Sequence, residues 1–257
     1  MNAAERRSQI KEILQNERTI SVSALAGRFE VSESTVRRDL ALISDSGAIR
    51  RTYGGAVMLD NLANELPLTL RERENIEAKN SIATIAASMI SDGSTLILDT
   101  SSTVIAMVPM LRDFDGLTVI TNGIKTSYLL NSYSRITTFC TGGRLREHNM
   151  SLVGSAACRR FEEINADLAF ISCRGFSIEK GITEASDEEA EVKRAMINAA
   201  ARVVLLCDAS KFGMVLMNRV CPAARISAVV TDIRPEKKYT DYFGQKGIKL
   251  YYTKSSV

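Results

Sequence analysis

The sequence predicts an α/β protein of two parts, and three observations lead to this prediction. Near the N-terminus, two short helical segments flank a tight turn, and a small basic strand follows them. From residue 94 onward, apolar β-branched runs alternate with helical segments, which is typical of a mostly parallel sheet covered by helices on both faces. The length of 257 residues suits about two domains. We therefore expect an N-terminal winged helix-turn-helix domain over residues 1–58, a linker over 59–76 and a C-terminal mostly parallel α/β sheet domain over 77–257.

The N-terminal segment contains three predicted helices and one short strand. Residues 3–16 place apolar side chains on one face of a first helix. The β-branched residues 19–22 are expected to pair with the later wing strand. Ser23 is a preferred helix-capping residue and predicts a second helix over 23–29, and Ser32 is expected to cap the third helix in the same way.

The third helix should pack inward through apolar side chains at helical spacing and end at a glycine. Gly47 tolerates the left-handed conformation that ends a helix. Residues 48–51 and Tyr53 then form the wing, and Gly54 and Gly55 are expected to turn the chain away. The residues expected to pack on the first two helices are Val36, Leu40 and Ile43.

The outward side of the third helix and the wing carry side chains suited to DNA. A helix-turn-helix lays its second helix in the major groove, where polar and cationic side chains reach base edges and phosphates. The net charge of +3 is modest, so binding must depend on where the charges lie. An arginine pair on a helix is often only a solvated surface, but its place after a tight turn and before a basic strand favours DNA contact. The predicted DNA contacts are Ser32, Ser34, Thr35, Arg37, Arg38, Arg50, Arg51 and Tyr53, with base readout and phosphate anchoring both open.

The remainder of the chain predicts a sheet of buried strands separated by helices. Strands are expected over residues 95–98, 117–120, 136–140, 168–172, 202–207, 228–230 and 249–252. Helices are expected near residues 104–112, 124–130, 155–163, 188–200 and 238–246, and an earlier one from the linker to about Ser91.

Polar and basic residues follow several of these strands. In a parallel sheet, ligands bind beyond the carboxyl ends of the strands. Hydroxyl groups and backbone N–H groups at a helix start, with arginine or lysine nearby, form a phosphate cradle. The segments that meet at this rim are residues 99–103, 121–123, 141–146 and 208–213. The sequence therefore predicts an anion site at one edge of the sheet.

Taken together, these segments resemble the DeoR family of bacterial transcriptional regulators over essentially the whole length. In the N-terminal part, the resemblance is carried by Val31 and Ser32, residues 35–40, Gly47, Arg51 and residues 54–56. In the C-terminal part, it is carried by residues 99–103, 121–122, 142–143, 145–146, Asp167, 181–183, 188–193, Asp208 and 210–213. This second part is similar to the family's sensor domain, which shares its fold with ribose-5-phosphate isomerase and glucosamine-6-phosphate deaminase.

The resemblance implies a repressor, usually of a sugar or sugar-alcohol operon, that a phosphorylated sugar or polyol releases from double-stranded operator DNA. It implies no catalytic residue and no cofactor. Three departures from the family pattern affect the sites: Ser101 replaces a usual glycine, Tyr53 replaces a histidine in the wing, and Arg174 and Glu184 stand where the family often has acidic or small polar residues. The effector contacts carried over are Asp99, Thr100, Ser101, Ser102, Thr103, Asn122, Gly143, Arg146, Lys193, Asp208 and Lys211.

Two other functions remain open from the residues alone. A sugar-phosphate isomerase or deaminase with an accessory DNA-binding domain needs a carboxylate base near the substrate carbon. After the strand over residues 168–172 the chain has Cys173, Arg174 and Gly175 instead of an acidic cluster, which favours a binding protein. A transcriptional activator of the same family is the second alternative, which the operator's position relative to the promoter would decide. Because a single winged head with little excess charge should bind weakly, we expect a homodimer or homotetramer.

Composition excludes several classes of protein. The five cysteines form no Cys-x-x-Cys pair and the chain has one histidine, so we expect no metal site and read the cysteines as small buried hydrophobic residues in a reducing compartment. No apolar run approaches the roughly 18–20 residues that span a bilayer, and the N-terminus does not resemble a signal peptide. The expected location is the cytoplasm, at the nucleoid when DNA is bound, with no membrane partner.

Overall fold

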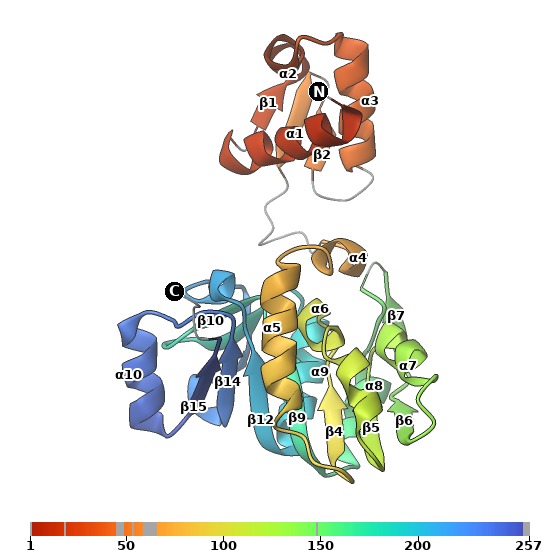
Figure 1. The fold of residues 1–257 in the computed structure, drawn as a ribbon, viewed down its shortest axis with the longest axis vertical. Coiled ribbons are helices and arrows are strands. Elements are labelled where there is room, and N and C mark those ends of the chain that lie inside the picture. The colour runs from red at the N-terminus through yellow and green to blue at the C-terminus, as the bar shows by residue number, and fades with distance from the viewer. Residues whose placement is uncertain are drawn as a thin grey trace. The chain divides into compact units, whose positions relative to one another are not determined.

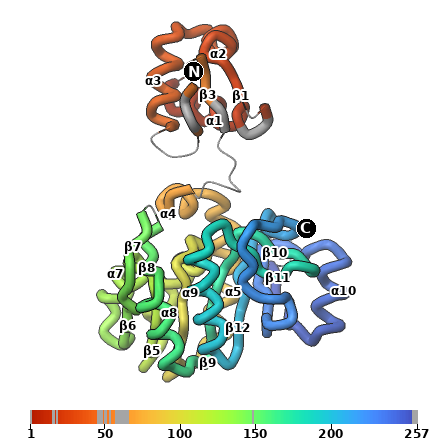
Figure 2. The backbone as a smooth tube through the Cα atoms, turned by 180° about the vertical axis from the view of Figure 1, so that it is seen from behind, coloured from red at the N-terminus to blue at the C-terminus, as the bar shows by residue number. Residues whose placement is uncertain are grey.

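The computed structural model describes residues 2–17, 19–44, 49–52, 54–58, 66–147 and 149–253 (Figures 1 and 2). The chain divides into two compact units, Met1–Leu70 and Arg71–Val257. The predicted helix end at Gly47, the wing residue Tyr53 and residues 59–65 of the expected linker lie outside the described residues. A four-residue helix, α4 (Leu68–Arg71), spans the boundary between the units.

The first unit is a helix-turn-helix with a three-stranded antiparallel sheet. Its elements are α1 (Ala3–Glu17), β1 (Thr19–Ser21), α2 (Val22–Phe29), α3 (Glu33–Ser44), β2 (Ile49–Thr52) and β3 (Gly55–Met58). The sheet has the order β1-β3-β2. The apolar positions predicted for the third helix are buried together with residues of the first two helices: Ile10, Leu14, Leu25, Val36, Leu40 and Ile43.

Three details of this unit differ from the sequence prediction. Ser21, not Ser23, caps α2, because Ser21 is the last extended residue and its hydroxyl accepts a hydrogen bond from the N–H of Ala24. Gly55 does not turn the chain away but begins β3, and β1 pairs with β3 rather than with β2. Glycine is required there, because a Cβ atom on Gly55 would lie 2.1 Å from the carbonyl oxygen of Ile20.

The second unit is built on a seven-stranded sheet whose pairings are all parallel. All seven predicted strands are present, in the spatial order β15-β14-β12-β9-β4-β5-β6. The central strands β4 and β9 therefore direct the residues that follow them to the middle of the rim. The strand bounds are β4 (Thr95–Leu98), β5 (Leu117–Thr121), β6 (Ile136–Cys140), β9 (Ala166–Ser172), β12 (Ala200–Leu206), β14 (Ala228–Thr231) and β15 (Lys249–Tyr252).

Helices cover both faces of this sheet, as the alternating pattern predicted. One face packs against α5 (Ile76–Ala87), α6 (Ser102–Ile105), the 3₁₀ helix η1 (Val108–Asp113) and α7 (Ile124–Leu130). The other face packs against α8 (Ser155–Glu162), α9 (Asp187–Asn198) and α10 (Lys237–Lys246). Figure 1 accordingly shows α5 in front of the sheet, and Figure 2, from behind, shows α8 and α9 in front of it. The strands are therefore buried from both sides, which explains their continuous apolar runs.

Some elements of the second unit were predicted wrongly or missed. The helix expected near residues 104–112 is two pieces, α6 and η1, because Pro109 has no N–H to continue an α-helix. The helix expected to reach Ser91 ends at Ala87. Cys140 is exposed because β6 is an edge strand, whereas the other four cysteines are buried. The missed strands are β7 (Arg144–Arg146), β8 (Ser151–Val153), β10 (Gly175–Ser177), β11 (Gly181–Glu184) and β13 (Asn218–Cys221), which are too short to show a period.

Among the residues that the structure describes, no helix is both long enough and apolar enough to cross a membrane.

Candidate functional site

The start of α3 is organised by a cluster of hydroxyl groups. The hydroxyl of Ser32 accepts a hydrogen bond from the N–H of Thr35 at 3.3 Å, as expected of a capping residue. It also lies 2.8 Å from the hydroxyl of Ser34 and 2.9 Å from that of Thr35. Ser32 and Ser34 are exposed, and Thr35 is half-buried. The predicted polar contacts of α3 therefore lie together at its first turn.

The arginines of α3 lie on the side opposite its apolar residues. Arg37 and Arg38 are exposed, whereas Val36 is fully buried. Arg37 forms an ion pair with Glu33 at 3.3 Å, and both side chains are about half exposed. Such surface pairs contribute about 0.3–0.5 kcal/mol, so Arg37 remains available to a phosphate or a base. Arg50 and Arg51 lie in β2, but their side chains are outside what the structure describes.

The position of α3 depends on an ionic contact that the sequence analysis missed. Asp39 is 3% exposed and accepts a hydrogen bond from Nε of Arg6 at 2.6 Å. A guanidinium nitrogen of Arg7 lies 3.4 Å from its other oxygen. These contacts join α1 to the inward side of α3. No local signal distinguishes this aspartate, because its partners lie in a different helix.

In the second unit, a pocket lies at the carboxyl ends of three neighbouring strands, β4, β9 and β12. It encloses about 390 Å³ of empty space, including its open mouth. Residues that follow these strands form most of its walls, and residues before and within α5 complete it. The lining residues are Arg71, Glu74, Asn75, Lys79, Ser101, Ser102, Thr103, Ser172, Cys173, Arg174, Asp208 and Lys211. Five of the predicted effector contacts are therefore brought together here: Ser101, Ser102, Thr103, Asp208 and Lys211.

The pocket is rich in positive charge and in hydroxyl groups. Four arginine and lysine side chains line it, against two carboxylates. The hydroxyl of Ser101 is already used, because it accepts a hydrogen bond from the N–H of Val104 at 3.1 Å. Within the part of the chain that the structure describes, the N–H groups of Ser102 and Thr103 donate to no protein atom. These groups and the cations are suited to hold an anion.

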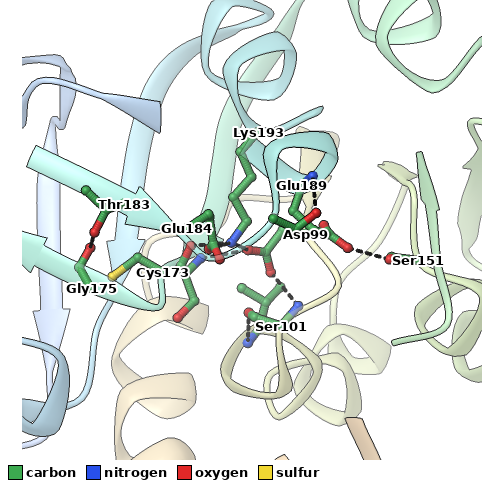
Figure 3. A network of polar contacts seen from close by, with 12 residues as sticks. Asp99, Ser101, Ser151, Cys173, Gly175, Thr183, Glu184, Glu189 and Lys193 are labelled. Atoms are coloured by element: carbon green, nitrogen blue, oxygen red, sulfur yellow. Dashed lines mark hydrogen bonds and ion pairs between the residues drawn. The ribbon is translucent and has the colours of Figure 1, made fainter. Parts of the chain in front are cut away.

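Behind the pocket, Lys193 is the centre of a buried ionic network (Figure 3). Its ammonium lies 2.5 Å from a carboxylate oxygen of Glu184 and 3.3 Å from one of Asp99, and it donates to the carbonyl of Ser172 at 2.7 Å. All three charged residues are below 10% exposure. Burial alone would lower the pKa of Lys193, but the charges of Glu184 and then Asp99 outweigh it and raise the pKa above its ordinary value. Lys193 is therefore a charged structural centre.

Asp99 and Lys193, both predicted effector contacts, support the pocket from behind and are not among its lining residues. Besides Lys193, Asp99 accepts hydrogen bonds from the N–H groups of Ser101 and Ser172, each at 2.8 Å. Because Ser101 and Ser172 line the pocket, the network orients both of them. A direct contact of Asp99 or Lys193 with an effector stays a prediction.

The other predicted effector contacts do not line this pocket, and three of them lie in or next to the hairpin β7–β8: Asn122, Gly143 and Arg146. The amide of Asn122 donates to the carbonyl of Leu152 at 3.0 Å. Arg146 pairs with Glu189 at 2.8 Å, and Ser151 donates to the same carboxylate at 2.5 Å (Figure 3). The residues of this group are Thr100, Asn122, Gly143 and Arg146, and their role in binding stays a prediction.

Several lining residues were not assigned to the pocket from the sequence. Ser172 and Cys173 come directly at the end of β9, so the strand-end rule that located residues 99–103 could have found them. Arg174 follows them; the sequence marked it as a departure from the family pattern that affects the sites, but not as an effector contact. Arg71 and Lys79 precede the first strand of the sheet, and no sequence pattern connects them with the rim. Only the tertiary structure brings them there: α5, which carries Lys79, packs on the sheet, and Lys79 donates to the carbonyl of Arg71.

Two family models match the chain. A DeoR-like helix-turn-helix domain covers residues 6–61, and a DeoR C terminal sensor domain covers residues 74–233. The chain belongs to the DeoR family. It is therefore a DNA-binding transcriptional regulator, and α3 is the helix that the helix-turn-helix geometry presents to DNA.

Three relatives of this DeoR-family chain are named as regulators or repressors, and each match covers most of both chains. The regulator GolR of Listeria innocua is 34% identical over 246 residues, which cover 96% of this chain and 97% of the relative. The repressor GlcR of Bacillus subtilis is 34% identical over 253 residues, with 98% and 97% covered. The repressor AccR of Agrobacterium fabrum is 31% identical over 229 residues, with 89% of each covered. The chain is thus a regulator and not an enzyme.

Two solved structures match this DeoR-family chain over part of its length at low identity. A D-ribose-5-phosphate isomerase in complex with phospho-erythronic acid matches with a TM-score of 0.41 and 13% identity over 53% of this chain and 54% of that chain. The eIF2B delta subunit of Chaetomium thermophilum matches with a TM-score of 0.44 and 17% identity over 77% and 63%.

We expect Arg37→Ala to weaken operator binding by about 1–3 kcal/mol, because an exposed guanidinium on α3 is lost while the core of the unit is untouched. The measurement is a fluorescence-anisotropy titration of operator DNA at fixed salt. Arg135→Ala is the matched control, since it removes an arginine side chain that is 68% exposed from the second unit. Equal affinities of Arg37→Ala and the unchanged chain would exclude Arg37 as a DNA contact.

Proposed function

We propose that this chain represses a sugar or sugar-alcohol catabolic operon and that a phosphorylated sugar or polyol releases it from the operator. The observation that supports the proposal is the pocket at the ends of β4, β9 and β12, with its four cations and its three hydroxyl-bearing residues 101–103. A phosphate monoester carries a charge of about −1.5 to −2 near neutral pH and has three strong acceptor oxygens. It matches this lining better than a neutral sugar does.

The two ends of such a ligand would meet different parts of the pocket. Lys211, Arg174 and the N–H groups of residues 102 and 103 suit the phosphate. The polar groups of Asn75 and Asp208 suit sugar hydroxyls, which both donate and accept hydrogen bonds. Asp208 is held in place because it accepts hydrogen bonds from the N–H and hydroxyl of Ser210.

In this proposal, binding of the effector in the pocket is thermodynamically coupled to binding of operator DNA. We propose that a homodimer or homotetramer presents two or more winged heads at operator spacing, because one head with little excess charge binds weakly. The effector binds more tightly to the state that does not bind DNA. The ratio of its affinities for the two states sets how far effector binding can lower the affinity for the operator.

The test begins with a DNA duplex that the full chain selects from random sequences. We expect at least one phosphorylated sugar or polyol to lower affinity for this duplex about 5–150-fold, the usual size of an allosteric coupling, and its unphosphorylated counterpart to have no effect. Lys211→Ala should require a higher concentration of the same compound for half-release, whereas Lys246→Ala, at an exposed position of α10, should not. Release by unphosphorylated sugars alone, or an unchanged response of Lys211→Ala, would contradict the proposal.

A further inference from the structure

Residues 71–75, here called the junction segment, directly follow the DNA-binding unit and contribute to the pocket of the second unit. Arg71 is the first residue of the second unit, and the chain runs directly from Leu70 of the DNA-binding unit into it. Three residues of the segment, Arg71, Glu74 and Asn75, line the pocket. Part of the pocket wall is therefore formed by the stretch of chain that leads to the DNA-binding unit.

Among the described residues, the side chains of Arg71, Lys125 and Lys79 hold the junction segment on the second unit. Arg71 donates to the side-chain oxygen of Asn149 at 3.0 Å. Lys125 forms an ion pair with Glu72 at 2.6 Å. Lys79, from α5, donates to the backbone carbonyls of Arg71 and Glu74, the second at 2.5 Å.

Lys79 differs from Lys125 in three respects. It lines the pocket, and both of its hydrogen-bond acceptors are neutral carbonyls, whereas Lys125 is paired with a carboxylate. It is also only 6% exposed. Burial lowers the pKa of Lys79, and the charge of Asp208 offsets this only in part. A buried ammonium with neutral partners gains more from a nearby anion than one already paired does.

We propose that Lys79 is a shared ligand that holds the junction segment when the pocket is empty and turns to the phosphate group when the pocket is filled. A charge-assisted hydrogen bond to a phosphate oxygen is roughly twice as strong as one between neutral groups, so a bound phosphate competes with the two carbonyls for the same ammonium. The carbonyls of Arg71 and Glu74 then lose their donor, and the junction segment loosens. Occupancy of the pocket thus reaches the chain segment that leads to the DNA-binding unit.

This inference rests on the proposed function, and its test separates effector affinity from coupling. The full chain is titrated onto the selected duplex with and without saturating inorganic phosphate, and with the releasing phosphorylated sugar in a second arm. Hydrogen–deuterium exchange follows the junction segment in parallel. In the unchanged chain, we expect the ligand to raise exchange of residues 71–75 and to lower DNA affinity about 10-fold.

Lys79→Met should remove the coupling. Exchange of residues 71–75 should be fast with and without ligand, and DNA affinity should change less than about 2-fold at saturation. Lys79→Gln keeps a donor for the carbonyls without a charge for the phosphate, so it should keep exchange slow and still lose the coupling. If Lys79→Met does not fold, Lys79→Gln alone tests the role of Lys79.

Two matched controls complete the design. Lys125→Met should loosen the same segment but keep the release by ligand, because Lys125 does not line the pocket. Lys211→Ala should weaken ligand affinity but keep the full release at saturation. Full release in Lys79→Met or Lys79→Gln overturns the role of Lys79. A wild-type chain that no phosphorylated ligand releases would instead overturn the proposed function.

Discussion

Lys193→Met is expected to destabilise the second unit by about 3–5 kcal/mol, because it removes the ammonium that pairs with two buried carboxylates. Asp99 and Glu184 are 1% and 3% exposed, so water cannot replace the ammonium. Asp99 keeps its two backbone N–H donors, whereas Glu184 loses the ammonium that lies 2.5 Å from its carboxylate. The carbonyl of Ser172 also loses its donor, which disturbs one wall of the pocket.

Hydrogen–deuterium exchange of peptides from β9 and β12 in the full chain measures this loss at fixed protein concentration. The double variant Lys193→Met/Glu184→Gln should recover much of the stability, because it removes the charge of one buried carboxylate together with that of the ammonium. Lys246→Met, at an exposed position of α10, should stay within about 0.5 kcal/mol of the unchanged chain. A Lys193→Met chain as stable as this control would show that the buried network does not support the fold.

Asp39→Ala is expected to destabilise the DNA-binding unit by about 3 kcal/mol. This value is the lower end of the range of about 3–5 kcal/mol for removing one partner of a buried ion pair. The side chain of Arg6 is only 11% exposed and would lose its carboxylate, while Arg7 is 32% exposed and can turn to water. A small domain has about 5 kcal/mol of stability in total, so operator binding should fall sharply although Asp39 points inward.

Exchange of peptides from α3 should rise in Asp39→Ala, while peptides from β9 keep their protection. Glu33→Ala is the matched control, because it removes a carboxylate of the same helix whose partner, Arg37, is exposed. It should change the stability of the unit by less than about 0.5 kcal/mol. Unchanged exchange of α3 in Asp39→Ala would contradict a structural role of the Asp39 contacts.

Much of the fold could be predicted because its signals are local. The N-terminal cap and apolar spacing of α3 and the seven apolar runs of the sheet are properties of short segments, and all of these features are present. The errors also have local causes. Five short strands were missed because three or four residues show no period, and Gly55 was taken for a turn because its close approach to Ile20 involves a distant strand.

The candidate site was predicted less completely than the fold. The strand-end rule correctly brought residues 101–103 and Lys211 to one pocket, because parallel strands end at the same edge. It could not show that Asp99 and Lys193 turn inward to Glu184, because a buried charge selects its partners by packing and not by sequence spacing.

By itself, the sequence determined a DNA-binding head, a parallel sheet and a polar rim, because periodicity, capping and strand ends are written in neighbouring residues. Only the tertiary structure decided which side chains face the pocket, which support it from behind and which hold the junction segment. Lys79 precedes every strand of the large sheet, yet the packing of α5 places it beside Asp208 and Lys211, at the end of β12. Contacts between segments far apart in the chain are chosen by burial and by charge pairing in three dimensions, and no local pattern records them.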